Sequence, residues 1–350
     1  MTARLSLADR LRRVIQAQGP IPVSDYMALA NAHYYATRDP LGAAGDFTTA
    51  PEISQMFGEL VGLALADLWD RAGRPEGARF VELGPGRGTL AADALRAMRA
   101  VGLEPPVHFV ETSPVLRSAQ AKLVPNAAWH DDLSTLPEDG PILAVANEYF
   151  DALPIRQLVS TGAGWRERLV GIDGDRFAPA AGPAVPASAV PAHVRGAPAG
   201  MVLESSPASL AQVRQLSRRM IMHGGAALIV DYGHDRLAAG ETLQAVRMHE
   251  YADPWIEPGE SDLTAHVDFE SLARAAAEAE VAVQGPVGQG EWLVRLGVDA
   301  RTEALARADP VRSESLRIAR NRLVSTEEMG RLFRVLGLSA PGWPALEGFR

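Results

Sequence analysis

Residues 80–89, Phe-Val-Glu-Leu-Gly-Pro-Gly-Arg-Gly-Thr, constrain the fold more than any other segment: an apolar strand runs into a Gly-x-Gly-x-Gly turn and then a helix. Glycines let the backbone approach a ligand closely, and the first N–H groups of the helix can point at it. A dinucleotide-binding turn instead has a third glycine at the position that Thr89 occupies here. The turn therefore predicts a ligand site that does not favour pyrophosphate, with an ordinary strand–helix turn as the alternative.

Short apolar runs alternate with helical stretches after residue 73. The runs are residues 79–83, 107–111, 127–130, 142–146 and 226–230, and the helical stretches include residues 90–99 and 114–123. Strands that alternate with helices are typical of a parallel sheet with right-handed crossovers. With further strands expected at residues 281–284 and 332–338, the pattern predicts an α/β fold with a mostly parallel seven-stranded sheet.

The chain is expected to divide into an N-terminal helical region, residues 1–73, and a core, residues 74–350. Ser6 and Gly19 bound one amphipathic helix, and Thr49 and Glu52 are expected to form a capping box for another. Two insertions are expected, at about residues 155–205 and 234–267. In the first we expect two antiparallel strands, followed by an irregular Ala/Pro-rich loop over residues 177–200.

Composition excludes several classes of function. The chain has no cysteine, which rules out disulfides, thiolate catalysis and cysteine-ligated metals, and no metal site is predicted. The formal net charge of −9 argues against binding of nucleic acid, and no apolar run reaches the ~20 residues of a membrane-spanning helix. The basic residues are nearly all arginine, which suits a GC-rich bacterial genome and predicts a cytoplasmic bacterial protein. A mitochondrial leader at residues 1–19 is the alternative, against which Asp9 argues.

Acidic residues follow the predicted strands at the sheet edge where α/β proteins bind ligands. Glu82, near the end of the first strand, suits a cationic ligand. Glu111 ends the next strand at a distance from Gly84 that fits a carboxylate accepting from two ribose hydroxyls, while capping the following helix is its alternative role. After the third strand, Asp131 or Asp132 can accept from an adenine amino group and Leu133 can cover the ring, unless these acids are only solvated loop residues.

The fourth strand gives way abruptly to Asn147, Glu148 and Asp151. Two carboxylates at this spacing can orient a guanidinium together and hold charge while a proton departs. Glu148 is the first catalytic candidate, Asp151 the second, and Asp231, at the end of the neighbouring strand, the third. A polar cap on the following turn is the alternative.

Five segments together resemble the MidA-like family of methyltransferases. They are residues 45–59, 82–88, 147–154, 231–234 and 262–269, which occur in the order of the family over nearly the whole chain. The resemblance implies a Rossmann-like class I methyltransferase core, S-adenosylmethionine as cofactor and a protein arginine as acceptor. The mitochondrial members of this family are complex I assembly factors that methylate an arginine of a core subunit, so a similar protein partner is expected here.

The resemblance also implies which residues bind the cofactor. These are Glu82, Gly84, Gly86, Gly88, Glu111 and the pair Asp131 and Asp132, to which we add Thr112, Leu133, Asn147, Asp46 and Thr49. A small-molecule methyltransferase, with the insertions closing an enclosed pocket, is one alternative. A weakly catalytic assembly chaperone is another, favoured if the carboxylates of residues 147–151 face away from the cofactor. The oligomeric state is not predicted.

Overall fold

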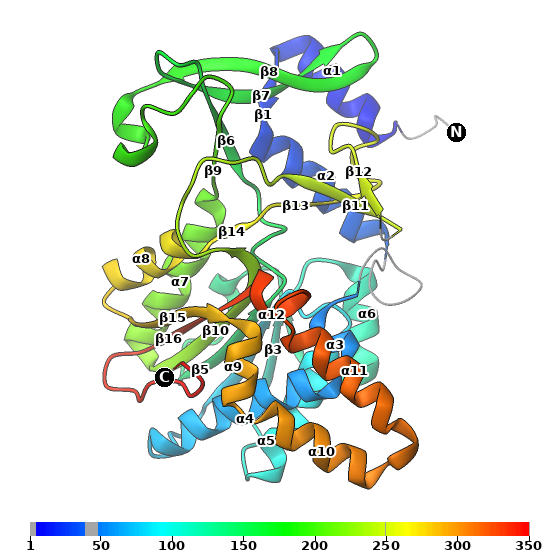
Figure 1. Cartoon of the computed structure of the whole chain (residues 1–350), viewed down its shortest axis with the longest axis vertical. Helices are drawn as coiled ribbons and strands as arrows, with labels where there is room; N and C mark the ends of the chain where they lie inside the picture. Colours follow the sequence, from blue (N-terminus) through cyan, green and yellow to red (C-terminus); the bar gives the residue numbers. More distant parts are fainter. Residues whose placement is uncertain (1–4, 39–47, 249, 350) are drawn as a thin grey trace.

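The computed structural model describes residues 5–38, 48–248 and 250–349, and its centre is a mixed sheet (Figure 1). The strands run in the order β15-β16-β10-β5-β2-β3-β4, and β14 pairs with β10. They are β2 (Arg79–Leu83), β3 (Val107–Val110), β4 (Ala128–His130), β5 (Ile142–Asn147), β10 (Gly225–His234), β14 (Val267–Asp268), β15 (Ala282–Gly288) and β16 (Phe333–Ser339).

Strand direction agrees with the predicted α/β fold. The pairings among β2, β3, β4, β5, β10 and β14 are parallel, whereas β16 is antiparallel to both β10 and β15. All seven predicted strands lie in this sheet. The predicted count is one too low, because β14 has only two residues, which is too short to show a periodic pattern.

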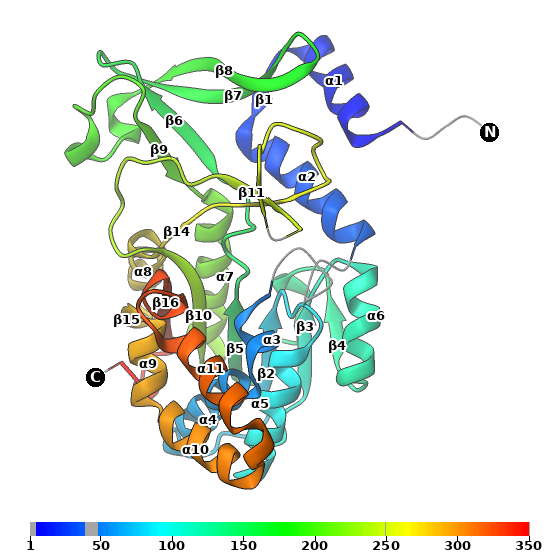
Figure 2. The same cartoon turned by 45° about the vertical axis from the view of Figure 1, so that its right-hand side comes forward.

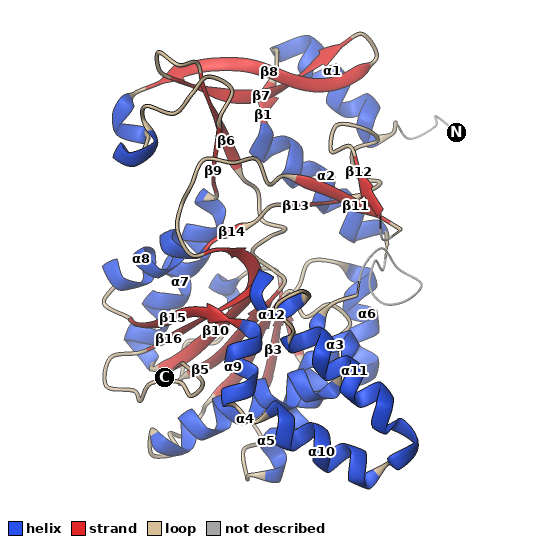
Figure 3. Cartoon of the chain, in the orientation of Figure 1, coloured by secondary structure: helices blue, strands red, loops and turns tan. Residues whose placement is uncertain are grey.

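Helices cover both faces of this sheet (Figures 1 and 3). One apolar cluster joins the sheet to α4 (Gln55–Arg71), α5 (Thr89–Ala100), α9 (Gln289–Arg295), α10 (Val298–Ala308) and α11 (Ser313–Val324). A second cluster joins the other face to α7 (Pro207–His223) and α8 (Phe269–Glu278). α6 (Pro114–Leu123) follows β3, and α12 (Met329–Leu332) precedes β16.

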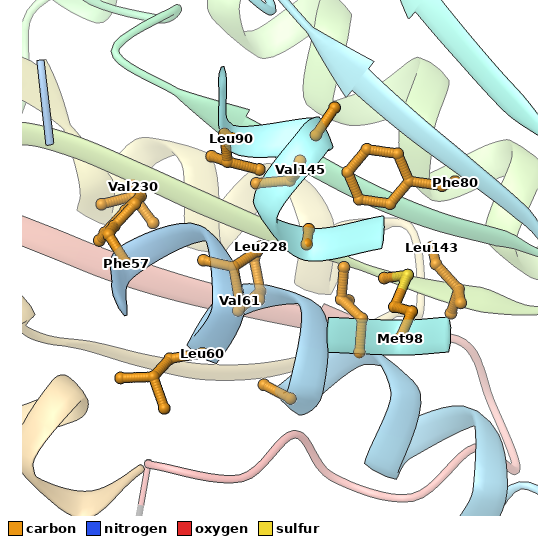
Figure 4. Packing of buried hydrophobic residues seen from close by; sticks show 14 of the residues in the cluster. Phe57, Leu60, Val61, Phe80, Leu90, Met98, Leu143, Val145, Leu228 and Val230 are labelled. Carbon is orange, nitrogen blue, oxygen red and sulfur yellow. The ribbon is translucent and has the colours of Figure 1, made fainter. Parts of the chain in front are cut away.

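Side chains of the central strands alternate between these two clusters, as the pleat of a strand requires. In β5, Leu143 and Val145 pack toward α4 and α5, whereas Ile142 and Ala144 pack toward α7 and α8. Figure 4 shows the first of these clusters with Phe57, Leu60, Val61, Phe80, Leu90, Met98, Leu143, Val145, Leu228 and Val230 labelled. The same alternation places Glu82, two residues after Phe80, on the α5 face of the sheet.

The N-terminal region packs on the first insertion, beyond the carboxyl edge of the central sheet (Figure 2). The elements are α1 (Leu7–Gln18), β1 (Ile21–Pro22), α2 (Val23–Thr37), β6 (Arg156–Ser160), β7 (Trp165–Asp173), β8 (Arg176–Val185) and β9 (Val202–Ser205). The loop predicted over residues 177–200 is wrong in its first part, which forms β8. Pro179 and Pro183 are tolerated there because, among the described strands, β8 pairs with β7 alone and needs no complete row of backbone donors.

The second insertion forms a small sheet of β11 (Gln244–Arg247), β12 (Glu250–Ala252) and β13 (Asp262–Thr264) in the order β12-β11-β13. Asn31 of α2 ties this insertion to the core. Its side-chain nitrogen donates to the carbonyl oxygens of Ala152 and Leu263 at 3.0 and 2.7 Å, and its oxygen accepts from the Leu263 N–H at 3.0 Å. In the described ranges, no helix has both the length and the apolar character needed to cross a membrane.

The predicted capping box of Thr49 and Glu52 does not form. Thr49 precedes the short helix α3 (Ala50–Ile53) without a side-chain cap, and Ser54 instead caps α4 by accepting from the Met56 N–H at 3.2 Å. The reason is that Glu52 turns toward the glycine turn, where it accepts a hydrogen bond from the Thr89 hydroxyl at 2.5 Å.

Gly62 on α4 allows the two helices α4 and α5 to pack at close range. A Cβ atom there would lie 2.5 Å from the carbonyl oxygen of Ala94. Because backbone cannot move aside as a side chain can, Gly62→Ala is expected to lower the free energy of unfolding by about 1–3 kcal/mol. Gly196→Ala, where a Cβ meets nothing within 4 Å, is the control and should change it by less than about 0.5 kcal/mol. Denaturant unfolding measures both, and equal stability of the two variants would contradict this packing.

Candidate functional site

A cavity of about 480 Å³ lies at the carboxyl ends of β2, β3 and β5. Its walls come from the glycine turn, from the residues after these three strands, and from α2 and α3 above them. The predicted residues that line it are Thr49, Glu82, Gly84, Gly86, Glu111, Thr112, Asp131, Asn147 and Glu148. Asp46 lies outside the described residues.

The glycine turn has the backbone conformation that its sequence demands. Gly84, Gly86 and Gly88 have φ angles of 60°, 54° and 87°, in the left-handed region that glycine enters at little cost. A Cβ on Gly84 would also lie 2.7 Å from the ring of Tyr149. Gly84 and Gly86 line the cavity, whereas Gly88 is the N-cap residue of α5 and does not. The first two glycines therefore lie where a ligand could approach the backbone, as the predicted role requires, and Gly88 does not.

Glu82 presents an unsatisfied acceptor beside this turn. The side chain is only 2% exposed, and within the described ranges its Oε2 atom has no hydrogen-bond partner. Burial raises the pKa of this carboxyl well above its usual range. A buried polar atom without a partner is costly, so a ligand that brings an N–H donor or a positive charge to Glu82 would relieve that cost.

Glu111 is held in place at the end of β3. Its Oε1 accepts from the Ser113 N–H at 2.7 Å, and its Oε2 accepts from the Gln120 side chain at 3.3 Å. The pKa of this carboxyl is raised by burial, which outweighs those hydrogen bonds. Ser113 caps α6, so the carboxylate lines the cavity while the next residues begin a helix. The helix cap is confirmed and leaves Glu111 in the cavity wall, whereas its binding of ribose hydroxyls stays a prediction.

Only one of the three residues predicted after β4 reaches the cavity. Asp131 lies at its rim, where it forms an ion pair with Arg117 at 2.6 Å. Asp132 points elsewhere and caps a short 3₁₀ turn, accepting from the Ser134 N–H at 2.7 Å. Leu133 is fully buried in the core cluster on the α7 face, which corrects its predicted position over a ligand ring.

Glu148 is the acidic side chain of the β5 turn that lines the cavity. Its φ angle is 50°, which is uncommon for a residue with a side chain and is frequent at functional sites. Its Oε1 accepts from the Ala50 N–H at 3.1 Å and from the Asn147 side chain at 3.3 Å. Burial, with the charges of Asp151 and Asp262, raises the pKa of Glu148 to about 8.

Asp151 and Asp231 lie behind this wall and do not line the cavity. Asp231 is buried, and its Oδ2 accepts from three consecutive N–H groups, those of Tyr149, Phe150 and Asp151, at 3.2, 2.9 and 3.2 Å. This corrects its predicted catalytic position, because its lone pairs are directed at the backbone. Asp151 accepts a hydrogen bond from the Tyr232 hydroxyl, and burial raises the pKa of Asp151 to about 6.

Sequence reasoning missed the contribution of α2 and of β13. Asn31 and Tyr35, one helical turn apart on α2, line the cavity, and Tyr35 donates to Asp262 of β13 at 2.9 Å. Asn31 and Tyr35 are the i and i+4 positions of a largely apolar helix, a spacing that could have indicated a polar wall. Nothing in that spacing says which part of the fold the wall faces.

The sheet order, the glycine turn and the acid at the end of β3 define the class of this protein as an α/β methyltransferase. The chain belongs to the Methyltransf_28 family, described as S-adenosyl-L-methionine-dependent methyltransferases, whose model matches residues 60–287. The predicted family, enzyme class and cofactor are thereby confirmed.

Named relatives extend the similarity over nearly the whole chain. The mitochondrial protein arginine methyltransferase NDUFAF7 homolog of Drosophila melanogaster is 39% identical, covering 95% of this chain and 84% of its own. Human mitochondrial NDUFAF7 is 36% identical, covering 93% and 81%. The crystal structure of a superfamily member from Burkholderia thailandensis bound to S-adenosyl-homocysteine has a TM-score of 0.88 at 31% identity, covering 98% of this chain and 94% of that one.

These relatives contradict the predicted cytoplasmic bacterial location. The curated relatives are mitochondrial proteins of animals, although the matched crystal structures come from a bacterium. The prediction was based on the use of arginine in place of lysine. That choice follows from the base composition of a genome and carries no information about the compartment in which a protein works.

Glu111→Gln should weaken binding of S-adenosylhomocysteine about 10- to 100-fold, because a charged acceptor is replaced by a neutral amide of nearly the same shape. Isothermal titration calorimetry measures this loss. Asp132→Asn, one strand further along the same edge but outside the cavity, is the matched control and should bind as the unchanged protein does. Equal weakening by both variants would move the cofactor site away from Glu111.

Proposed function

We propose that this methyltransferase acts on an arginine side chain of a partner protein, with Glu148 as the residue that receives the proton of the acceptor. The observation that carries this proposal is the position of Glu148, a carboxylate at the end of β5 that lines the cavity among other acids. Support also comes from the relatives, which are named protein arginine methyltransferases.

The cavity residues fit S-adenosylmethionine. The unsatisfied oxygen of Glu82 suits the ammonium group of its methionine end, and the carboxylate of Glu111 suits the two ribose hydroxyls. Gly84 and Gly86 keep side chains out of the space between them, while Thr49, Thr112, Asp131 and Asn147 are further contacts in this proposal. When bound, S-adenosylmethionine supplies a methyl group on a sulfonium, and the electrons of the broken carbon–sulfur bond return to sulfur.

An arginine acceptor needs both a negative wall and a proton acceptor. The guanidinium is permanently charged, and its nitrogen lone pair becomes available only as an N–H proton leaves. Glu148 can receive that proton on its carboxylate, and the charges that act on it are those of Asp151 and Asp262, both negative. In this proposal the negative charge of Asp151 helps to attract the guanidinium from outside the cavity. Asp231 fixes the turn on which Glu148 and Asp151 lie.

The acceptor protein is proposed to be a core subunit of respiratory complex I or an equivalent partner. We also propose that the chain divides into a helical region, residues 1–73, and a methyltransferase core, residues 74–350. A surface for the partner is supported by α2 and the second insertion, at about residues 234–267, which meet above the carboxyl edge of the sheet (Figure 1). The first insertion, at about residues 155–205, packs beyond them with α1 and is proposed as further binding surface for the partner.

Two alternative functions are less well supported by this geometry. A weakly catalytic chaperone was favoured only if the carboxylates after β5 faced away from the cofactor, but Glu148 lines the same cavity as Gly84 and Gly86. A small-molecule acceptor is not suggested by the names of the curated relatives. The arginine acceptor therefore remains the function that we propose.

Glu148→Gln should keep cofactor affinity and reduce methyl transfer to an arginine acceptor by about 10²- to 10⁴-fold, because the proton acceptor is lost while shape is kept. The pH dependence gives a second readout. Since the pKa of Glu148 is raised to about 8, the carboxylate is protonated below that pH and charged above it. The kcat/KM for the acceptor should therefore rise with pH through about 8 in the unchanged enzyme.

Transfer of radioactive methyl groups to an arginine peptide, measured from pH 6 to 9.5, provides both readouts. Glu76→Gln, which changes an exposed glutamate in the loop before β2, is the control and should keep the rate and the pH profile. A Glu148→Gln enzyme that transfers methyl groups at the original rate would exclude Glu148 as the proton acceptor.

A further inference from the structure

A partly buried hydrogen bond joins α2 to the second insertion at the cavity that Glu148 also lines. The Tyr35 hydroxyl donates to Oδ1 of Asp262 at 2.9 Å; Tyr35 lines the cavity, and Asp262 is only 4% exposed. Burial is the largest cause of the raised pKa of Glu148 and of Tyr35, and the negative charges of Asp151 and Asp262 add to both. Segments more than 200 residues apart in sequence therefore meet at the wall of the cavity.

Several groups that line the cavity offer hydrogen-bond acceptors. The Tyr35 hydroxyl has one proton, which Asp262 receives, so what it can offer a ligand is an oxygen lone pair. Oδ1 of Asn147, a cavity residue, is buried and has no hydrogen-bond partner in the described part of the chain. Glu148 adds a carboxylate. Such a wall suits a ligand that has several N–H donors and a positive charge, as a guanidinium does.

We propose that Tyr35 and Asp262 are positioning residues of the acceptor site, in which Asp262 orients the Tyr35 hydroxyl so that its oxygen accepts an N–H of the acceptor guanidinium. The second insertion is then part of the methyl-transfer site and is more than a surface for the partner protein. This inference rests on the arginine acceptor proposed above. Under it, the guanidinium would lie between the Tyr35 hydroxyl of α2 and the Glu148 carboxylate that follows β5.

A purely structural role would not need this pair. Asn31 already joins α2 to β13 through hydrogen bonds with both backbone groups of Leu263. Arg38 and Glu260 form a second link between the same two segments, with more solvent exposure. Two other links thus hold α2 against the second insertion, whereas Tyr35 is the residue of this pair that also lines the cavity.

The first test measures binding of a guanidine probe. N-acetyl-arginine amide is titrated into the complex of the enzyme with S-adenosylhomocysteine, and the expected loss of affinity is about tenfold for Tyr35→Phe and for Asp262→Asn. The double variant should lose little more than either single one, because the two residues act as a unit. Glu260→Gln is the matched control, since it weakens the other contact between the same segments and should leave the affinity unchanged.

The second test uses the pH profile, which shows whether the charge of Asp262 acts on Glu148. The negative charge of Asp262 helps to raise the pKa of Glu148. Asp262→Asn removes that charge, so the rise of kcat/KM with pH should move to lower pH, while Glu260→Gln should leave it in place. Affinity for S-adenosylhomocysteine, measured on each variant, shows that the rest of the site is intact.

The outcomes separate this inference from the proposed function. If the unchanged enzyme neither binds the guanidine probe nor methylates arginine, the proposed acceptor is wrong and the positioning role falls with it. If the unchanged enzyme does both, but Tyr35→Phe and Asp262→Asn match Glu260→Gln in affinity and in pH profile, only the positioning role is wrong. A loss of cofactor binding in Asp262→Asn leaves Tyr35→Phe to decide, because that variant retains every charge.

Discussion

The carboxylate of Asp231 determines the shape of the site on which the rest of the chemistry depends. Oδ2 accepts from three consecutive N–H groups after β5, and Oδ1 accepts from the Tyr232 N–H at 2.9 Å. Consecutive backbone donors that converge on one oxygen fix the course of the chain, because no regular secondary structure would satisfy them. The left-handed conformation of Glu148 occurs in this turn. Asp231 thus acts through the backbone on the turn that carries Glu148, without lining the cavity.

Desolvated acids are the second constraint on this site. Glu82, Glu148 and Asp151 are all held where burial raises their pKa. Each is costly in the free protein, and each would gain from a cation or an N–H donor placed next to it. The free protein therefore carries unfavourable electrostatics that ligands with positive charge can relieve. Both substrates of an arginine methyltransferase carry such charge, one as a sulfonium with an ammonium group and the other as a guanidinium.

The sequence predicted the parts of the site that belong to the sheet. Glu82, Gly84, Glu111 and Glu148 follow directly from strand ends, because parallel strands bring their carboxyl ends to one edge whatever the loops do. The side-chain alternation of β2 also accounts for the face on which Glu82 lies. The loop beyond β4 was less predictable, because the adjacent residues Asp131 and Asp132 differ in role: the first lies at the rim and the second caps a 3₁₀ turn. Periodicity cannot distinguish two neighbouring residues.

The contribution of the additions could not be predicted, for a different physical reason. The amphipathic pattern of a helix shows that one side is buried, but not what it is buried against. Tyr35 and Asp262 meet only because α2 and β13 both fold back over the sheet edge, and their contact has no local signature in either segment. A Rossmann-like core serves many chemistries with a similar cofactor site, so the core alone does not determine which acceptor binds. Segments that fold back over the sheet edge can supply that selectivity. In this chain the sheet supplies Glu82, Glu111 and Glu148 to the cavity, and α2 supplies a further wall. Under the function that we propose, the choice of acceptor then depends on residues outside the shared core.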